Sequence, residues 1–514
     1  MNRLLHIYRA TVTALTIAIV GTFVTPPAAM AQYNPNKMHS NIFLPVPPTD
    51  SSASKMVDNY LYFYYKKFRT TAYSPIVSFD KYYVLDSLYK SNAIPFGIRI
   101  SNSNSPNILS FVSKAMTAID YGDYVSKSFF QRIRPAVRFY EATFAIETLN
   151  YLNYNLSRRL SYPSAHTLRG TGLSLVLASI AHNRQDTILH RGYDFGQSRI
   201  IGGAHWHSDV EAARLIASVN FARMFASGTA LTDLETAKNE YISLTQNDTA
   251  PSVEQITHSD EGMKRALSYI PEPLLGDNPI TAWDQRQYTW GRTQRDTQLA
   301  QQAIEDSELT PENIGFQFSQ AFKTDINELY TPKLYYLIQQ ITKLALQGCD
   351  HLATTQYNRT RPCILFNDPP GVPEDNEYLA TTSSYPCRHA AVGWAVGMLL
   401  NAVNSENVDS VMLRAYQYGY ERVIAGTNWE SDTEVGRRVG IAAFVRLASA
   451  SDFSQAIAEA QSEDQELRER IIVEVNRIAD DENQTSPMFT IDGLPADNHS
   501  RGVLVGRNKK IFRP

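Results

Sequence analysis

The chain has 514 residues, and its 52 acidic and 48 basic side chains give a formal net charge of −4 at pH 7. Hydrophobic residues make up 43% and charged residues 19%, a balance that excludes a charge-rich disordered chain. We expect no nucleic-acid partner from this charge balance. The sequence also lacks a phosphate-loop motif and a dinucleotide glycine fingerprint. Three cysteines are too few for a disulfide framework or a four-cysteine zinc site.

The N-terminus has the pattern of a secretory signal. Basic residues among the first nine positions precede an apolar run over 10–24, and Ala29 and Ala31 give a cleavage site. The run of about 15 residues is shorter than the roughly 20 that span a bilayer. We therefore expect removal of residues 1–31 and a periplasmic or secreted protein with no retained membrane span. Such an oxidising compartment would allow one disulfide among the three cysteines, and the sequence leaves the pair open.

An internal repeat is the strongest signal of organisation. The segment 161–166 (SYPSAH) recurs as 384–389 (SYPCRH), an offset of 223 residues. The same offset without a gap aligns Arg191 with Arg414, Tyr193 with Tyr416, Gly196 with Gly419, Arg199 with Arg422, Gly203 with Gly426, Trp206 with Trp429 and Asp209 with Asp432. Two homologous domains are therefore predicted.

Helical periodicity dominates both domains. Apolar residues recur at helical spacing over 167–181, 210–225 and 433–450, residues 390–403 read as a buried helix, and strand-like alternation is scarce. We predict an all-α protein of two tandem helical bundles. In chain order its parts are a signal peptide (1–31), an extended lead (32–55), a first domain (56–245), a linker (246–261), a second domain (262–480) and a polar, basic tail (481–514).

Basic residues and a helix start in the first domain could bind an anion. Lys127 and Arg134 are seven residues apart, which predicts that both lie on one helix face two turns apart. Ser164 precedes the apolar helix and is a natural N-cap, and the free backbone N–H groups of such a start attract anions.

Two histidines and a carboxylate complete this set. Arg199 and His205 are six residues apart, and Asp209 follows four residues later, so that on a helix its carboxylate can hold one imidazole nitrogen. Fixed cations and donors of this kind stabilise the charge of a transferring phosphoryl group. A neutral His205 can act as nucleophile, and a protonated His166 can give its proton to the leaving alkoxide.

The three motifs resemble the signature of the type 2 phosphatidic acid phosphatase superfamily: Lys127-x6-Arg134-Pro135, Pro163-Ser164-x-His166 and Ser198-Arg199-x5-His205-x3-Asp209. Residues 196–209 and 132–135 are most similar to the bacterial class A nonspecific acid phosphatases. The resemblance covers the first domain well and continues through the second. It implies an all-α acid phosphatase that hydrolyses phosphate monoesters, with phosphotransferase activity as an addition, in which the second domain is a degenerate copy.

The resemblance also implies a role for each matching residue. His205 would form a phosphohistidine, Asp209 would orient it, and His166 would be the general acid and then activate water. The phosphate would be held by Lys127, Arg134, Ser164, Ala165 and Arg199, with Ser198 as a supporting hydrogen-bonder. No catalytic metal and no cofactor are expected. The family usually has glycine at position 165, so the methyl group of Ala165 would weaken activity or narrow the range of substrates.

The second domain departs from the signature. Thr354, Cys387, Glu421 and Asn428 stand where the first domain has Lys127, Ser164, Ser198 and His205. Asparagine cannot form the covalent intermediate, and Glu421 is expected to put negative charge where an anion would bind. Two interpretations remain: a degenerate domain kept for packing, in a pseudo-dimer of domains, or a site that binds anions without turnover.

Two other functions fit the same residues. Vanadium-dependent haloperoxidases bind vanadate in this pocket as a cofactor, whereas vanadate would inhibit a phosphatase. A non-catalytic phosphate-binding protein is the other alternative. The expected partner is a small phosphomonoester, and further homo-oligomerisation stays open.

Overall fold

The computed structural model describes residues 33, 38–50, 52, 54–69, 85–120, 123–141, 160–259, 261–355, 357–373, 376–485, 489–490, 502–505 and 510–513. The predicted signal peptide lies outside them. The chain divides into two units, residues 1–460 and 461–514.

Helices build the first half of the first unit. They are α2 (Lys55–Lys66), α4 (Leu85–Phe96), α5 (Pro106–Asp120), α6 (Asp123–Phe130), α7 (Pro135–Arg138), α8 (Ala165–Ile180), α9 (Gln185–Ile201), α10 (His207–Arg223), the 3-10 helix η3 (Met224–Ala226) and α11 (Gly228–Thr245).

The second half repeats this order. After α12 (Val253–Thr257) and α13 (Glu261–Ala266) come α14 (Pro279–Thr293), α15 (Gln298–Glu305), α16 (Pro311–Phe322), α17 (Pro332–Thr355), α18 (Pro362–Leu365), α19 (Asn376–Thr381), α20 (Arg388–Val403), α21 (Val408–Ala425), α22 (Glu430–Ala448) and α23 (Phe453–Thr485). Helices α20, α21 and α22 thus correspond to α8, α9 and α10.

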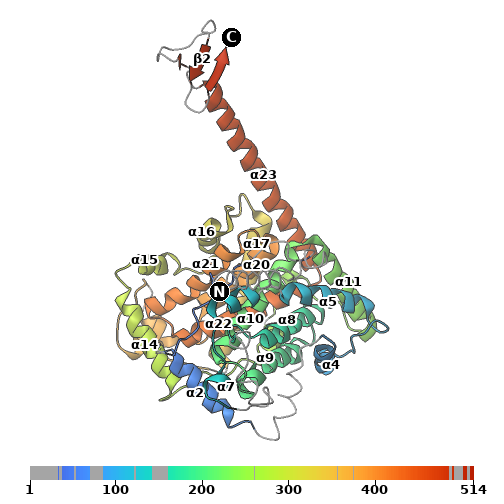
Figure 1. Cartoon of the computed structure of the whole chain (residues 1–514), viewed down its shortest axis with the longest axis vertical. Helices are drawn as coiled ribbons and strands as arrows, with labels where there is room; N and C mark the ends of the chain where they lie inside the picture. The colour runs from blue at the N-terminus through green and yellow to red at the C-terminus, as the bar shows by residue number, and fades with distance from the viewer. Residues whose placement is uncertain are drawn as a thin grey trace, which may run out of the picture. The chain divides into compact units, whose positions relative to one another are not determined.

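The two halves share one hydrophobic core. Helices α8, α10, α20 and α22 lie at its centre (Figure 1), and α10 packs against α20 across the boundary between the halves. These helices are buried around most of their circumference because neighbours cover them on several sides. Trp394 of α20 is fully buried, and its Nε1 donates to Ser218 Oγ of α10 at 3.0 Å. The two halves therefore support each other through this shared core.

The predicted lead and linker also carry buried contacts. Met38, Phe43 and Leu44 of the lead belong to the shared core. Helix α11 ends at Thr245, where the linker was predicted to begin, and the short helix α12 lies inside that linker.

Strands occur only near the C-terminus among the described residues. In the second unit, β1 (Phe489–Thr490), β2 (Gly502–Val505) and β3 (Lys510–Arg513) form an antiparallel sheet in the order β1-β2-β3. The predicted polar tail, 481–514, thus contains a short sheet. Both halves of the first unit are helical, as predicted. None of the helices that are described is long and apolar enough to cross a membrane.

Candidate active site

The segment that carries Lys127 and Arg134 is not one helix, contrary to the prediction from their spacing. Helix α6 ends at Phe130, and Gln131 has a left-handed backbone with φ of 45°. Arg134 is extended, with φ of −69° and ψ of 150°, because Pro135 disfavours a helical conformation in the residue before it. This break separates the two cations and lets each approach the site from its own direction.

The start of helix α8 lies beside Lys127. The predicted N-cap is confirmed, because Ser164 Oγ accepts from the backbone N–H of Thr167 at 3.3 Å. It also accepts from the Thr167 hydroxyl, which leaves the Ser164 proton for another acceptor. Lys127 Nζ donates to the carbonyl of Pro163, one residue before the cap. The backbone N–H of Ala165 begins the helix, and half-buried His166 follows it in the first turn.

A tight loop after helix α9 positions His205. The Arg199 carbonyl accepts from the backbone N–H groups of Ala204 at 3.0 Å and His205 at 3.3 Å. Gly203 makes this turn possible with φ of 71°, a conformation that residues with a Cβ rarely adopt. Arg199 is 1% exposed, and its Nε donates to Ser198 Oγ at 3.1 Å.

The ring of His205 is held at both nitrogen atoms. Nδ1 lies 2.9 Å from the Ser161 carbonyl and 3.4 Å from Asp209 Oδ2, and Nε2 lies 2.7 Å from Arg134 Nη1. A nitrogen that faces acceptors carries the proton, and one that faces a guanidinium N–H does not. The network therefore assigns the proton to Nδ1 and leaves the lone pair on Nε2.

Asp209 and His205 do not share a helix as their spacing suggested, since α10 begins at His207. Asp209 instead caps α10, and its Oδ2 accepts from the Trp206 backbone N–H at 2.8 Å. The Ser161 hydroxyl also donates to Oδ2, and Arg132 donates to Oδ1 at 2.6 Å. The carboxylate is thus fixed mainly by groups other than the histidine.

Burial and charge set the protonation of this pair. Burial, with a further contribution from Arg134, lowers the pKa of His205 to about 3. Although burial opposes it, Arg132 and His205 hold the pKa of Asp209 well below its usual range. A neutral imidazole beside a carboxylate is therefore kept across the mildly acidic range.

Sequence reasoning missed the ion-pair network behind Asp209. Arg132 bridges Asp209 and Asp58, and Ser208 bonds Asp58 through both its backbone N–H, at 3.0 Å, and its hydroxyl, at 2.7 Å. The signal was present in the repeat, because Arg-x-Arg-Pro occurs both at 132–135 and at 359–362.

The second half keeps this network without the histidine. Arg359 bonds Asp432 at 2.6 Å and Asp284 at 2.7 Å, as Arg132 does with Asp209 and Asp58. Asn428 replaces the histidine and donates to the Ser384 carbonyl at 2.6 Å, the counterpart of the His205 contact with Ser161. The two halves therefore share one hydrogen-bonded frame.

The chain itself occupies the anion-binding groups of the second half. Arg422, the counterpart of Arg199, donates to the carbonyl of Ala303 at the end of α15. His389, the counterpart of His166, lies 3.1 Å through Nε2 from the Ser307 carbonyl. These backbone contacts take the place that a phosphate would need. The matching stretch of the first half, residues 70–84, lies outside the described residues.

The sequence predicted a negative charge at Glu421, but its surroundings in the structure favour the neutral form. Burial, together with its neighbour Asp306, raises the pKa of Glu421 well above its usual range. Arg414 binds Asp306 at 2.6 Å and lies 3.5 Å from Glu421. A raised pKa favours the neutral form of Glu421, so this side chain blocks an anion more by filling the pocket than by carrying a charge.

The three cysteines are buried, and none of them forms a disulfide in this structure. Cys387 occupies the N-cap position of α20 without a side-chain cap bond, and burial raises its pKa to about 11. It is neither a nucleophile nor a disulfide partner in this structure.

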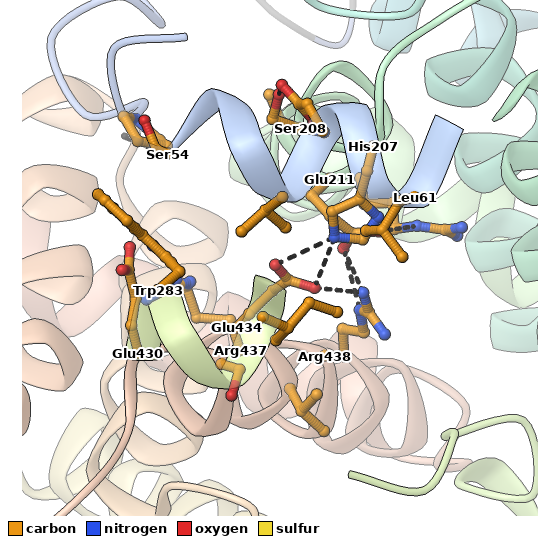
Figure 2. Close-up of a pocket in the computed structure, with 18 of the residues that line it drawn as sticks. Ser54, Leu61, His207, Ser208, Glu211, Trp283, Glu430, Glu434, Arg437 and Arg438 are labelled. Carbon is orange, nitrogen blue, oxygen red and sulfur yellow. Dashed lines mark hydrogen bonds and ion pairs between the residues drawn. The ribbon is translucent and has the colours of Figure 1, made fainter. Parts of the chain in front are cut away.

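One group among the described residues has spacing that suits a metal ion: His207, Glu211 and Glu434, whose ligand atoms lie within 4.8 Å of one another. Figure 2 shows that Arg438 already contacts both carboxylates, at 2.8 Å and 2.6 Å. The guanidinium supplies the positive charge that a cation would bring, so the donor set does not fit a metal well.

Comparison with known proteins places this arrangement in a family. The sequence model of the PAP2 superfamily matches residues 109–231 and 335–454, one region in each half. The chain belongs to the PAP2 superfamily as a tandem duplication.

Its similar relatives are named acid phosphatases. The non-specific acid phosphatase of Salmonella typhi is 31% identical over 215 residues, which cover 42% of this chain and 86% of that protein. The non-specific acid phosphatase of Providencia stuartii is 30% identical over 203 residues, 40% of this chain and 82% of the relative. The acid phosphatase of Zymomonas mobilis is 29% identical over 200 residues, with 39% and 74% coverage. Each match covers less than half of this chain and most of the relative.

Proposed function

We propose that this chain is a periplasmic or secreted acid phosphatase that hydrolyses phosphate monoesters through a phosphohistidine on its first half. That the chain is a phosphatase follows from its family and its relatives. The proposal of a phosphohistidine rests on the ring of His205, in which the proton is held on Nδ1 and the lone pair of Nε2 is directed at Arg134.

The proposed reaction has two displacements. Nε2 of His205 attacks phosphorus while the ester P–O bond breaks, and His166 gives its proton to the leaving alkoxide. Lys127, Arg134, Arg199 and the start of α8 hold the phosphate oxygens and stabilise the charge of the transition state. His166 then takes a proton from water, which attacks phosphorus and breaks the P–N bond. Phosphate leaves, and His205 regains its lone pair.

Hydrolysis of p-nitrophenyl phosphate in the presence of a chelator tests this proposal. We expect turnover in the wild type and a loss of several powers of ten in His205→Ala, since removing a covalent nucleophile has effects of about 10⁴-fold or more. The matched control is Asn428→Ala, the same change at the equivalent position of the second half, which should retain activity. Equal turnover in the wild type and His205→Ala would refute the assignment.

Mass spectrometry after an acid-free quench should find phosphate on a peptide containing His205. No metal or cofactor takes part in the proposed steps, so the chelator should have no effect. Halide oxidation with added vanadate distinguishes the haloperoxidase alternative, in which vanadate would activate the protein instead of inhibiting it.

A further inference from the structure

A cavity of about 540 Å³ lies between the two halves of the first unit. The starts of α10 and α22 border it, together with α2 and α14 (Figure 2). Tyrosines related by the repeat line it from both halves, Tyr162 with Tyr385 and Tyr193 with Tyr416, among proline and aliphatic side chains. Its volume falls within the range of about 300–1,000 Å³ that is typical of small-molecule sites.

The charged side chains that α10 contributes to the cavity are paired. Arg214 Nε bonds Glu211 at 3.1 Å, one turn away on the same helix. Another nitrogen of Arg214 donates to the Tyr193 carbonyl at 3.0 Å. The neighbouring residue, Leu215, adds an apolar surface.

The equivalent turn of α22 is paired differently. The counterpart of Leu215 is Arg438, whose guanidinium bonds Glu434 at 2.6 Å and reaches across the cavity to Glu211 at 2.8 Å. Glu434 also lies 3.4 Å from His207 Nε2 (Figure 2). The close partners of Glu434 are therefore Arg438 and His207, whereas its counterpart Glu211 bonds Arg214, the counterpart of Arg437.

Arg437 forms no ion pair among the described residues, although its charge acts on Glu430 and Glu434 of the same helix. Its side chain lines the cavity and is 5% exposed, yet Nε and Nη1 have no hydrogen-bond partner in the part of the chain that the structure describes. The guanidinium packs on the ring of Tyr416, with its carbon 4.4 Å from the ring centre. Glu430 is nearby on the same helix, but burial raises its pKa to about 7, so it carries a partial charge at neutral pH. A buried charge without a partner is costly, and an anion would relieve that cost.

We propose that the cavity between the halves binds an organic monoanion, whose carboxylate meets Arg437 and whose apolar body lies against the tyrosine and aliphatic walls. This site is separate from the proposed phosphate pocket, and its existence does not depend on the phosphatase reaction.

Calorimetric titration of the full chain tests the proposal with three probes. Phenylacetate has both an anion and an apolar body, acetate has the anion alone, and 2-phenylethanol has the body alone. Saturating inorganic phosphate is present throughout to occupy the pocket around His205. We expect phenylacetate to bind at one site per chain, at least about tenfold more tightly than either of the other probes, because a charge-assisted hydrogen bond and apolar burial each contribute.

The variant Arg437→Gln should weaken phenylacetate binding by at least about tenfold. The matched control is Arg388→Gln, which removes an arginine of the second half that forms a surface ion pair with Asp350 and should bind like the wild type. Because Arg437→Gln removes an unpaired buried charge, its melting temperature should equal or exceed that of the wild type. Leu215→Trp, which fills the cavity from the opposite wall, should abolish binding through a different residue.

Two results would overturn the proposal directly. They are no binding of phenylacetate to the wild type in saturating phosphate, and binding that neither Arg437→Gln nor Leu215→Trp changes. Equal affinity for 2-phenylethanol and phenylacetate would also overturn it, since the cavity would then select for apolar surface alone.

Discussion

The two halves of this chain have the same hydrogen-bonded frame and different pockets. In both, an arginine joins two buried aspartates, a serine and a capping tryptophan hold those aspartates, and a left-handed glycine, Gly203 or Gly426, closes the turn before the site. In the first half this frame carries His205, whereas in the second it carries Asn428, and backbone carbonyls occupy the nearby arginine and histidine. The frame is therefore common to both halves, and only a few residues placed on it distinguish the proposed catalytic pocket from the second one.

The largest effect on activity is expected when the residues at positions 205 and 428 are exchanged between the two halves. His205→Asn gives the first half the residue of the second, and we expect kcat/KM for p-nitrophenyl phosphate to fall by about 10⁴-fold or more. The double variant His205→Asn/Asn428→His should not recover activity, because Ala303 and Ser307 still occupy the second pocket. Recovery to within tenfold of the wild type would mean that this pocket opens to substrate.

Removing the central arginine of the frame should lower the stability equally in both halves. Arg132→Met and Arg359→Met each leave two buried aspartates without their partner, so each should lower the free energy of unfolding by about 3–5 kcal/mol. Urea denaturation measures this loss. At urea concentrations too low to unfold either variant, only Arg132→Met should reduce kcat, because Arg132 holds Asp209 and Asp209 orients His205. A similar loss of kcat in Arg359→Met would show that the halves are catalytically coupled.

The raised pKa of Glu421 should appear as a pH dependence of stability. Burial raises the pKa of Glu421 in the folded state, so the unfolded chain releases this proton at a lower pH. The stability it contributes is therefore present below the unfolded pKa and is lost as pH rises towards the folded one. Glutamine at this position cannot ionise. Between pH 5 and pH 8 the stability of Glu421→Gln relative to the wild type should therefore rise by about 1 kcal/mol or more, which melting temperatures measured across this range would show. A constant difference between the two proteins across this pH range would argue against a raised pKa of Glu421 in the folded state.

The smallest effect is expected at Ala165, the one departure from the family pattern in the first half. Ala165→Gly removes a methyl group at the first position of α8, beside the proposed phosphate site. We expect KM for p-nitrophenyl phosphate to fall a few-fold, while the free energy of unfolding drops by about 0.5–1 kcal/mol because glycine destabilises a helix. An unchanged KM would show that the methyl group points away from the substrate.

The helical fold and the duplication could be predicted from the sequence alone. Apolar residues at helical spacing predict helices, and a repeat that keeps its register over about fifty residues predicts two copies of one fold. The sequence also predicted the N-cap at Ser164 and aligned Trp206 with Trp429. Both tryptophans are buried, and their indole N–H groups donate to the equivalent carbonyls of Ile133 and Thr360.

Tertiary structure decided how these parts meet. Spacing suggested that Lys127 shares a helix with Arg134, and His205 with Asp209, but a left-handed Gln131 and a late start of α10 separate both pairs. The groups that replaced these local contacts, Ser161 and Arg132 around Asp209, and α15 over the second pocket, come from distant parts of the chain. Periodicity reports only neighbours along the chain, whereas a buried charge takes its partner from whichever segment packs against it.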